Sequence, residues 1–152
     1  MRSCELPRSN ASVSEIDGIL ATAKTIAVVG LSDKPDRDSH MVARYLQANG
    51  YRIIPVNPGE AEVLGERAYA NLASIPAGIA IDVVDIFRKP EFIPAIVDAA
   101  IARGARTIWM QFGLVHNEAA EKARAAGLEV VMDRCMKVEH ARWVAHQPAS
   151  QP

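Results

Sequence analysis

The feature that most constrains the fold is a regular alternation of apolar, β-branched runs with segments of helical periodicity. Residues 25–30 (TIAVVG) are continuously apolar up to a glycine, a pattern typical of a strand buried on both faces of a parallel sheet. Four further strands are predicted at residues 51–56, 80–87, 107–111 and 128–132. Within the run 80–87, we place Asp82 and Asp85 at the polar margins of the strand.

Helical segments separate these strands. Ser12 and Glu15 have the spacing of a capping box and open a first short helix. Further helices are predicted at residues 39–49, 90–103, 117–126 and 139–144, with Phe92 in a buried stripe and Asn117 as an N-cap. Alternation of this kind requires right-handed crossovers. It therefore predicts a doubly wound, Rossmann-like α/β fold, with a parallel five-stranded sheet and helices on both faces.

A chain of 152 residues has the length of one domain. We place that domain at residues 12–144, between a flexible leader at 1–11 and a flexible tail at 145–152. Seventeen Lys and Arg against eighteen Asp and Glu leave a formal charge of −1, which gives no electrostatic support for binding nucleic acid or anionic membranes. No signal peptide or membrane-spanning run is recognised, so a cytoplasmic location is expected. Cys4 and Cys135 are not expected to form a disulfide.

In doubly wound sheets, ligands bind beyond the carboxyl ends of the strands. The loop at residues 30–39 leads from the first strand to a helix N-terminus, where free amides favour a phosphate. Lys34 and Arg37 are outnumbered in this loop by three aspartates, so phosphate binding and a plain capped loop both stay open. The loop lacks the GxGxxG pattern, and Asn57 lies where dinucleotide-binding folds keep a ribose-binding acid. Both features count against an NAD(P)-dependent oxidoreductase, which is the alternative on this fold.

Five ordered motifs carry a resemblance to a known family. They are IAVVGLSDKPDRDSHMVARYL, GYRIIPVNP, DIFRKPE, GARTIWMQFG and AGLEVVMDRCMKVEH. Together they resemble the small standalone CoA-binding proteins, which are related to the CoA-binding domain of succinyl-CoA synthetase alpha subunits. The resemblance covers roughly residues 12–144. Asp38 departs from a proline that is common at this position in the family.

The resemblance implies a protein that binds coenzyme A, or an acyl-CoA, through the adenosine-diphosphate end of the ligand. It implies that the diphosphate is approached by Gly30, Leu31 and Ser32. It places Lys34, Arg37 and Ser39 near the phosphates of CoA. Asn57 and Pro58 are implied to border the adenosine, and Phe87 and Arg88 to pack against adenine or hold a phosphate. Gln111 and Gly113 are implied to line the pantetheine side.

We predict no catalytic residues and no metal site, because no CxxC or HExxH spacing is present. Cys135 and His140 also allow a nucleophile with a base, and Cys135 a mixed disulfide with CoA, which keeps a redox-sensing role open. Acyl-CoA synthesis of the synthetase kind needs a partner subunit. A protein partner or a homo-oligomer is compatible with the sequence, which identifies neither. Trp109 is expected in the core, and Arg88 is read either as a ligand contact or as a partner of Glu91.

Overall fold

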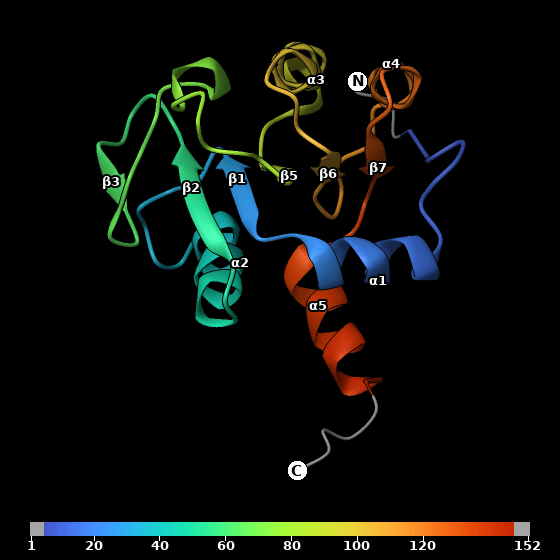
Figure 1. The fold of residues 1–152 in the computed structure, drawn as a ribbon, viewed down its shortest axis with the longest axis horizontal. Helices are drawn as coiled ribbons and strands as arrows, with labels where there is room; N and C mark the ends of the chain where they lie inside the picture. Colours follow the sequence, from blue (N-terminus) through green and yellow to red (C-terminus); the bar gives the residue numbers. More distant parts are fainter. Residues whose placement is uncertain (1–4, 148–152) are drawn as a thin grey trace.

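The computed structural model describes residues 5–147 and confirms the predicted Rossmann-like α/β fold (Figure 1). Its main sheet has the order β2-β1-β5-β6-β7, and every neighbouring pair is parallel. The strands are β1 (Thr25–Val29), β2 (Arg52–Val56), β5 (Val83–Ile86), β6 (Thr107–Met110) and β7 (Glu129–Val131). Because the chain adds β2 on one side of β1 and the later strands on the other, the topological switch point lies between β1 and β5.

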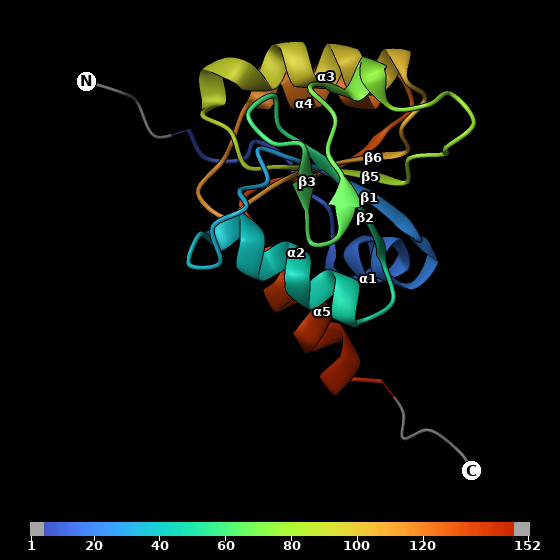
Figure 2. The same ribbon diagram turned by 90° about the vertical axis from the view of Figure 1, so that its left-hand side faces the viewer.

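Helices cover both faces of the sheet (Figures 1 and 2). One face carries α1 (Val13–Thr22), α2 (Asp38–Ala48) and α5 (Met136–Ala145). The other face carries α3 (Ile93–Ala102) and α4 (Asn117–Ala125). No helix among residues 5–147 is long and apolar enough to cross a membrane.

Each strand serves two hydrophobic cores, because successive side chains point to opposite faces. In β1, Ile26 and Val28 pack in the core under α1, α2 and α5, whereas Ala27 and Val29 pack under α3 and α4. Trp109 is fully buried in the first of these cores, as predicted. Its indole nitrogen donates a hydrogen bond to the Arg134 carbonyl at 2.8 Å.

The segment between β2 and β5 has structure that the sequence pattern did not indicate. It contains the short antiparallel pair β3 (Glu62–Val63) and β4 (Glu66–Arg67), followed by the 3₁₀ turn η1 (Leu72–Ser74). Tyr69 bridges to Val56 beside β2. This bridge protects part of the outer edge of β2, which would otherwise present unpaired backbone groups.

Several predicted boundaries are confirmed and others are wrong. Ser12 and Glu15 form the capping box of α1. The N-cap of α4 is His116 rather than Asn117, since the imidazole Nδ1 accepts the Ala119 amide at 3.1 Å. Helix α5 begins at Met136, three residues earlier than predicted. Phe92 closes the 3₁₀ turn η2 (Pro90–Phe92) and is 39% exposed, so its predicted place in a buried stripe is wrong.

Residues 5–11 make contacts that a flexible leader is not expected to make. The Glu5 carboxylate accepts hydrogen bonds from the backbone and side chain of Asn117. Asn10 bonds both the amide and the carbonyl of Met132, at 2.9 Å each. Cys4 and residues 148–152 lie outside the described residues.

Asp85 is the main exception to the apolar core, and its predicted place at a strand margin is wrong. It lies within β5, between Val28 and Trp109 on the neighbouring strands, and is fully buried. Neither carboxyl oxygen has a hydrogen-bond partner among the described residues. Burial therefore raises the pKa of Asp85 well above 3.8, because it disfavours the charged form. Asp82, by contrast, accepts the amides of Lys24 and Thr25 at the start of β1.

The raised pKa of Asp85 predicts a pH-dependent loss of stability. Above pH 3.8 the unfolded carboxyl loses its proton while the folded one keeps it, so the folded state binds more protons and stability falls as pH rises. We expect Asp85→Asn to remove this contribution. The free energy of unfolding of the variant, minus that of wild type, should rise from pH 4 upward by up to about 1.4 kcal/mol per pH unit.

Urea titrations at pH 4 to 8 measure this difference. Asp85→Val also removes the carboxyl, but it does not introduce the unpaired side-chain amide that Asp85→Asn buries. It should give the same pH trend. A difference that stays constant with pH in both variants would show that Asp85 is ionised in the folded protein.

Candidate functional site

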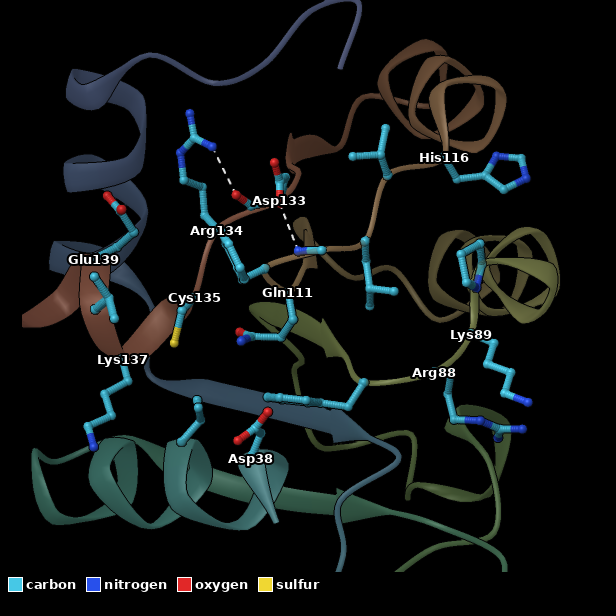
Figure 3. Close-up of a pocket in the computed structure, with 18 of the residues that line it drawn as sticks. Asp38, Arg88, Lys89, Gln111, His116, Asp133, Arg134, Cys135, Lys137 and Glu139 are labelled. Carbon is cyan, nitrogen blue, oxygen red and sulfur yellow. Dashed lines mark hydrogen bonds between the residues drawn. The ribbon is translucent and has the colours of Figure 1, made fainter. Parts of the chain in front are cut away.

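A cavity of about 1150 Å³ opens at the carboxyl-terminal edge of the sheet (Figure 3). Its walls come from the segments that follow β5, β6 and β7, and from the first turns of α2 and α5. This is the edge at which the sequence predicted a ligand. The cavity lies over β5, β6 and β7, however, rather than over β1 and β2.

Four of the twelve predicted site residues line the cavity: Phe87, Arg88, Gln111 and Gly113. The remaining eight belong to the loops that follow β1 and β2 or, for Ser39, to the first turn of α2, and do not line the cavity: Gly30, Leu31, Ser32, Lys34, Arg37, Ser39, Asn57 and Pro58. The predicted set is therefore divided between a cavity and a neighbouring pair of loops.

Gly30 joins these two parts of the site. It has φ +89°, in the left-handed region that side chains disfavour. A Cβ atom at this position would lie 2.4 Å from the Phe87 carbonyl oxygen and 3.0 Å from Cδ of Arg88. Only glycine allows the end of β1 to lie so close to the segment that enters the cavity wall.

The loop at residues 30–39 is held by short polar contacts. The Ser32 amide donates to the Ser39 hydroxyl at 3.0 Å, and the Lys34 amide donates to the Ser32 hydroxyl at 3.1 Å. His40 Nδ1 lies 2.9 Å from the Ser32 carbonyl oxygen. Lys34 and Arg37 are exposed and form no ion pair within the described residues.

Asn57 ties the loop after β2 to the loop after β1. Its side-chain nitrogen donates to the Leu31 carbonyl at 3.0 Å, while its side-chain oxygen accepts the Gly59 amide at 2.9 Å. The Leu31 side chain is fully buried in the core, so only its backbone is available to a ligand. Pro58 is exposed beside this contact.

Four cationic side chains surround the cavity: Arg88, Lys89, Arg134 and Lys137 (Figure 3). None of them forms an ion pair with another described residue. The guanidinium of Arg88 lies 4.2 Å from the centre of the Phe92 ring, and no salt bridge to Glu91 forms. Nothing in the local sequence marks Lys89, Arg134 or Lys137 as facing a cavity, so none of the three was a predicted site residue.

Two helix N-termini border the site without a cap from their own N-cap side chains. Arg37 precedes α2 and Cys135 precedes α5, and neither side chain accepts a first-turn amide. The side chain of Gln111, which is almost fully buried, accepts the Met136 amide at 3.1 Å and so anchors the start of α5 to β6. Uncapped amides beside unpaired cations form a setting that favours a bound anion.

Asp133 fixes the loop after β7 against the loop after β6. It has φ +58°, which is uncommon for a residue other than glycine. Its carboxylate accepts the Gly113 amide at 2.7 Å. This contact holds two sides of the cavity together, and nothing in the local sequence predicted it.

Cys135 lies half-buried in the cavity wall (Figure 3). His140, the base considered for it, is buried and lies 2.8 Å from the Tyr45 hydroxyl through Nδ1. Burial lowers the pKa of His140. No hydrogen bond joins His140 to Cys135 within residues 5–147. No group of three or more metal-ligating side chains occurs in the same range.

Comparison with known proteins gives one family. The model of the CoA binding domain family matches residues 24–141. The uncharacterized protein YneT of Bacillus subtilis (strain 168) is 46% identical over 132 residues, which cover 87% of this chain and 96% of YneT.

Solved structures share the fold. A hypothetical protein from Pyrococcus horikoshii OT3 is 41% identical, with a TM-score of 0.85, over 95% of this chain and 99% of that one. The dinucleotide-forming acetyl-coenzyme A synthetase 1 of Ca. Korarchaeum cryptofilum has a TM-score of 0.63 at 21% identity. That match covers 72% of this chain and 26% of the synthetase, and at this identity it shows a shared fold only.

The close approach at Gly30 predicts a position-specific loss of stability. Gly30→Ala should destabilise the fold by at least about 2 kcal/mol, because a left-handed φ and a backbone clash are both penalised. Gly127→Ala is a matched control, since Gly127 has φ +92° but no atom within 4 Å of an added Cβ. It should lose only about 1 kcal/mol. Equal losses in urea titrations would mean that the contact with Phe87 is unimportant.

Proposed function

We propose that this chain, which belongs to the CoA binding domain family, binds coenzyme A or an acyl-CoA through the adenosine-diphosphate end and catalyses no reaction itself. The observation that carries the proposal is the cavity of about 1150 Å³ whose wall meets the loop at residues 30–39 through the close approach of Gly30 to Phe87 and Arg88. Its volume slightly exceeds the usual range of about 300–1,000 Å³ for small-molecule sites. A long ligand such as CoA suits a site that extends from loops into a cavity.

The division of the predicted residues suggests how the ligand runs along the sheet edge. The loops after β1 and β2, which contain Ser32 and Asn57, would hold the adenosine-diphosphate end. The pantetheine arm would then pass Gly30 and Arg88 and enter the cavity beside Gln111. This direction follows the strand order from β2 and β1 towards β6 and β7.

Lys34 and Arg37 are the cations of the proposed phosphate site. Both side chains are exposed. Arg37 is the residue just before α2, and Lys34 lies three residues earlier in the loop. The free amides at the start of α2 add positive potential there. Asp33, Asp36 and Asp38 lie in the same loop and oppose that potential. The two cations would therefore contribute by direct contact with phosphate oxygens rather than through a broad positive field.

Two of the carboxylates that line the cavity are engaged within the fold, which supports a binding role, whereas Asp38 and Glu91 have no ion-pair partner among the described residues. Asp133 accepts the Gly113 amide, and Glu139 pairs with Arg142 at 3.1 Å. Each therefore has a partner within the fold. An adjacent acid and base free to exchange protons with a substrate is what general acid–base chemistry requires.

Calorimetric titration tests the binding claim and its orientation. We expect CoA to bind wild-type protein and adenosine 3′,5′-bisphosphate compounds to compete with it, whereas pantetheine alone should bind weakly. Lys34→Ala and Arg37→Ala should each weaken CoA binding by about tenfold, the loss typical of a charge-assisted hydrogen bond. Arg44→Ala, an exposed cation on α2 outside the loop and the cavity, is the control and should bind as wild type.

Three results would count against the proposal. Absence of heat with millimolar CoA, on protein verified as ligand-free, would refute CoA binding. Tight binding of pantetheine without competition from the bisphosphate would reverse the assigned orientation. Equal losses of CoA affinity in Lys34→Ala and Arg44→Ala would show that the loop at residues 30–39 does not bind the phosphates.

A further inference from the structure

Two large apolar side chains stand exposed on the wall of the same cavity. Phe112 is 77% exposed in the segment after β6, and Val138 is 60% exposed in the first turn of α5. A single exposed apolar residue is ordinary on a protein surface. Two such side chains, from separate elements that line one cavity, favour an apolar ligand group there.

Further apolar residues line the same cavity. Val42 and Val115 are buried and also line the cavity, as do the partly buried Met41 and Leu114. An aliphatic group that enters between Phe112 and Val138 thus meets further apolar surface.

The position of these residues identifies which part of a ligand they would meet. Phe112 follows β6, and Val138 belongs to the helix that follows β7. These are the two strands farthest from β2, at whose end the adenosine would lie. The thiol end of CoA is the end remote from the adenosine, so an acyl group on that thiol would reach this wall.

We propose that Phe112 and Val138 bind the aliphatic chain of an acyl-CoA, so that the protein prefers acyl thioesters with several methylenes to free CoA. This inference rests on the proposed function and deepens it, because it names the ligand class. Each methylene that leaves water strengthens binding roughly three- to fourfold. Hexanoyl-CoA should consequently bind at least tenfold more tightly than CoA, with butyryl-CoA between them.

Calorimetric titrations with CoA, butyryl-CoA, hexanoyl-CoA and free hexanoate test the inference. In Phe112→Ser and Val138→Ser, the ratio of hexanoyl-CoA affinity to CoA affinity should fall at least threefold. Val144→Ser is the matched control, because Val144 is 50% exposed on the same helix but does not line the cavity. Its ratio should equal that of wild type. Thermal melts identify any variant that fails to fold, and substitutions at exposed positions rarely cause this.

The outcomes separate this inference from the proposed function. If CoA binds and hexanoyl-CoA binds no more tightly, the acyl site is refuted and CoA binding stands. If Val144→Ser lowers the ratio as much as Val138→Ser does, the assignment to this wall is refuted. If hexanoate alone binds as tightly as hexanoyl-CoA, the site is one for fatty acids and the thioester assignment is wrong. If none of the four compounds binds, both proposals fail.

Discussion

The site depends on one close backbone approach, between Gly30 and the Phe87 carbonyl at the switch point of the sheet. The two strands that end there, β1 and β5, send their loops to opposite sides, and only a residue without a side chain fits between them. This approach brings the polar loop at residues 30–39 beside Arg88, and hence beside the cavity. The close packing of these two parallel strands thus places the loop at residues 30–39 and the cavity side by side, as the two parts of the proposed ligand site.

A second set of contacts positions α5, whose first turn lines the cavity. Helix α5 returns after β7 to pack against α2, where His140 contacts the Tyr45 hydroxyl and lies edge-on to Tyr45, Tyr51 and Trp143. Gln111 anchors the start of α5 to the end of β6. Because its start and its middle are held by specific groups, α5 has a fixed position beside the cavity, which Lys137 and Val138 of its first turn line.

Local patterns predicted most of the fold, since the buried strands are apolar runs and Ser12 forms the capping box of its helix. Asp85 was placed wrongly because a carboxyl in an apolar run suggests a polar margin, whereas burial in its neutral form leaves no local trace. Asn117 was wrongly predicted as the N-cap of α4, because its side chain instead binds Glu5 and Leu6, which are far away in sequence, and His116 caps the helix. The exposure of Phe112 and Val138 depends on how distant elements enclose the cavity, so no periodicity could indicate it.

The sequence, the family match and the cavity lead to one central claim, that coenzyme A lies along the carboxyl-terminal edge with its adenosine over β1 and β2. A crystal structure of the protein with CoA tests this most directly. The account predicts density for the diphosphate beside Ser32 and the N-terminus of α2, with the pantetheine arm in the cavity beside Gln111. Adenine density in the cavity over β6 and β7, or no ligand density from crystals grown with saturating CoA, would contradict it.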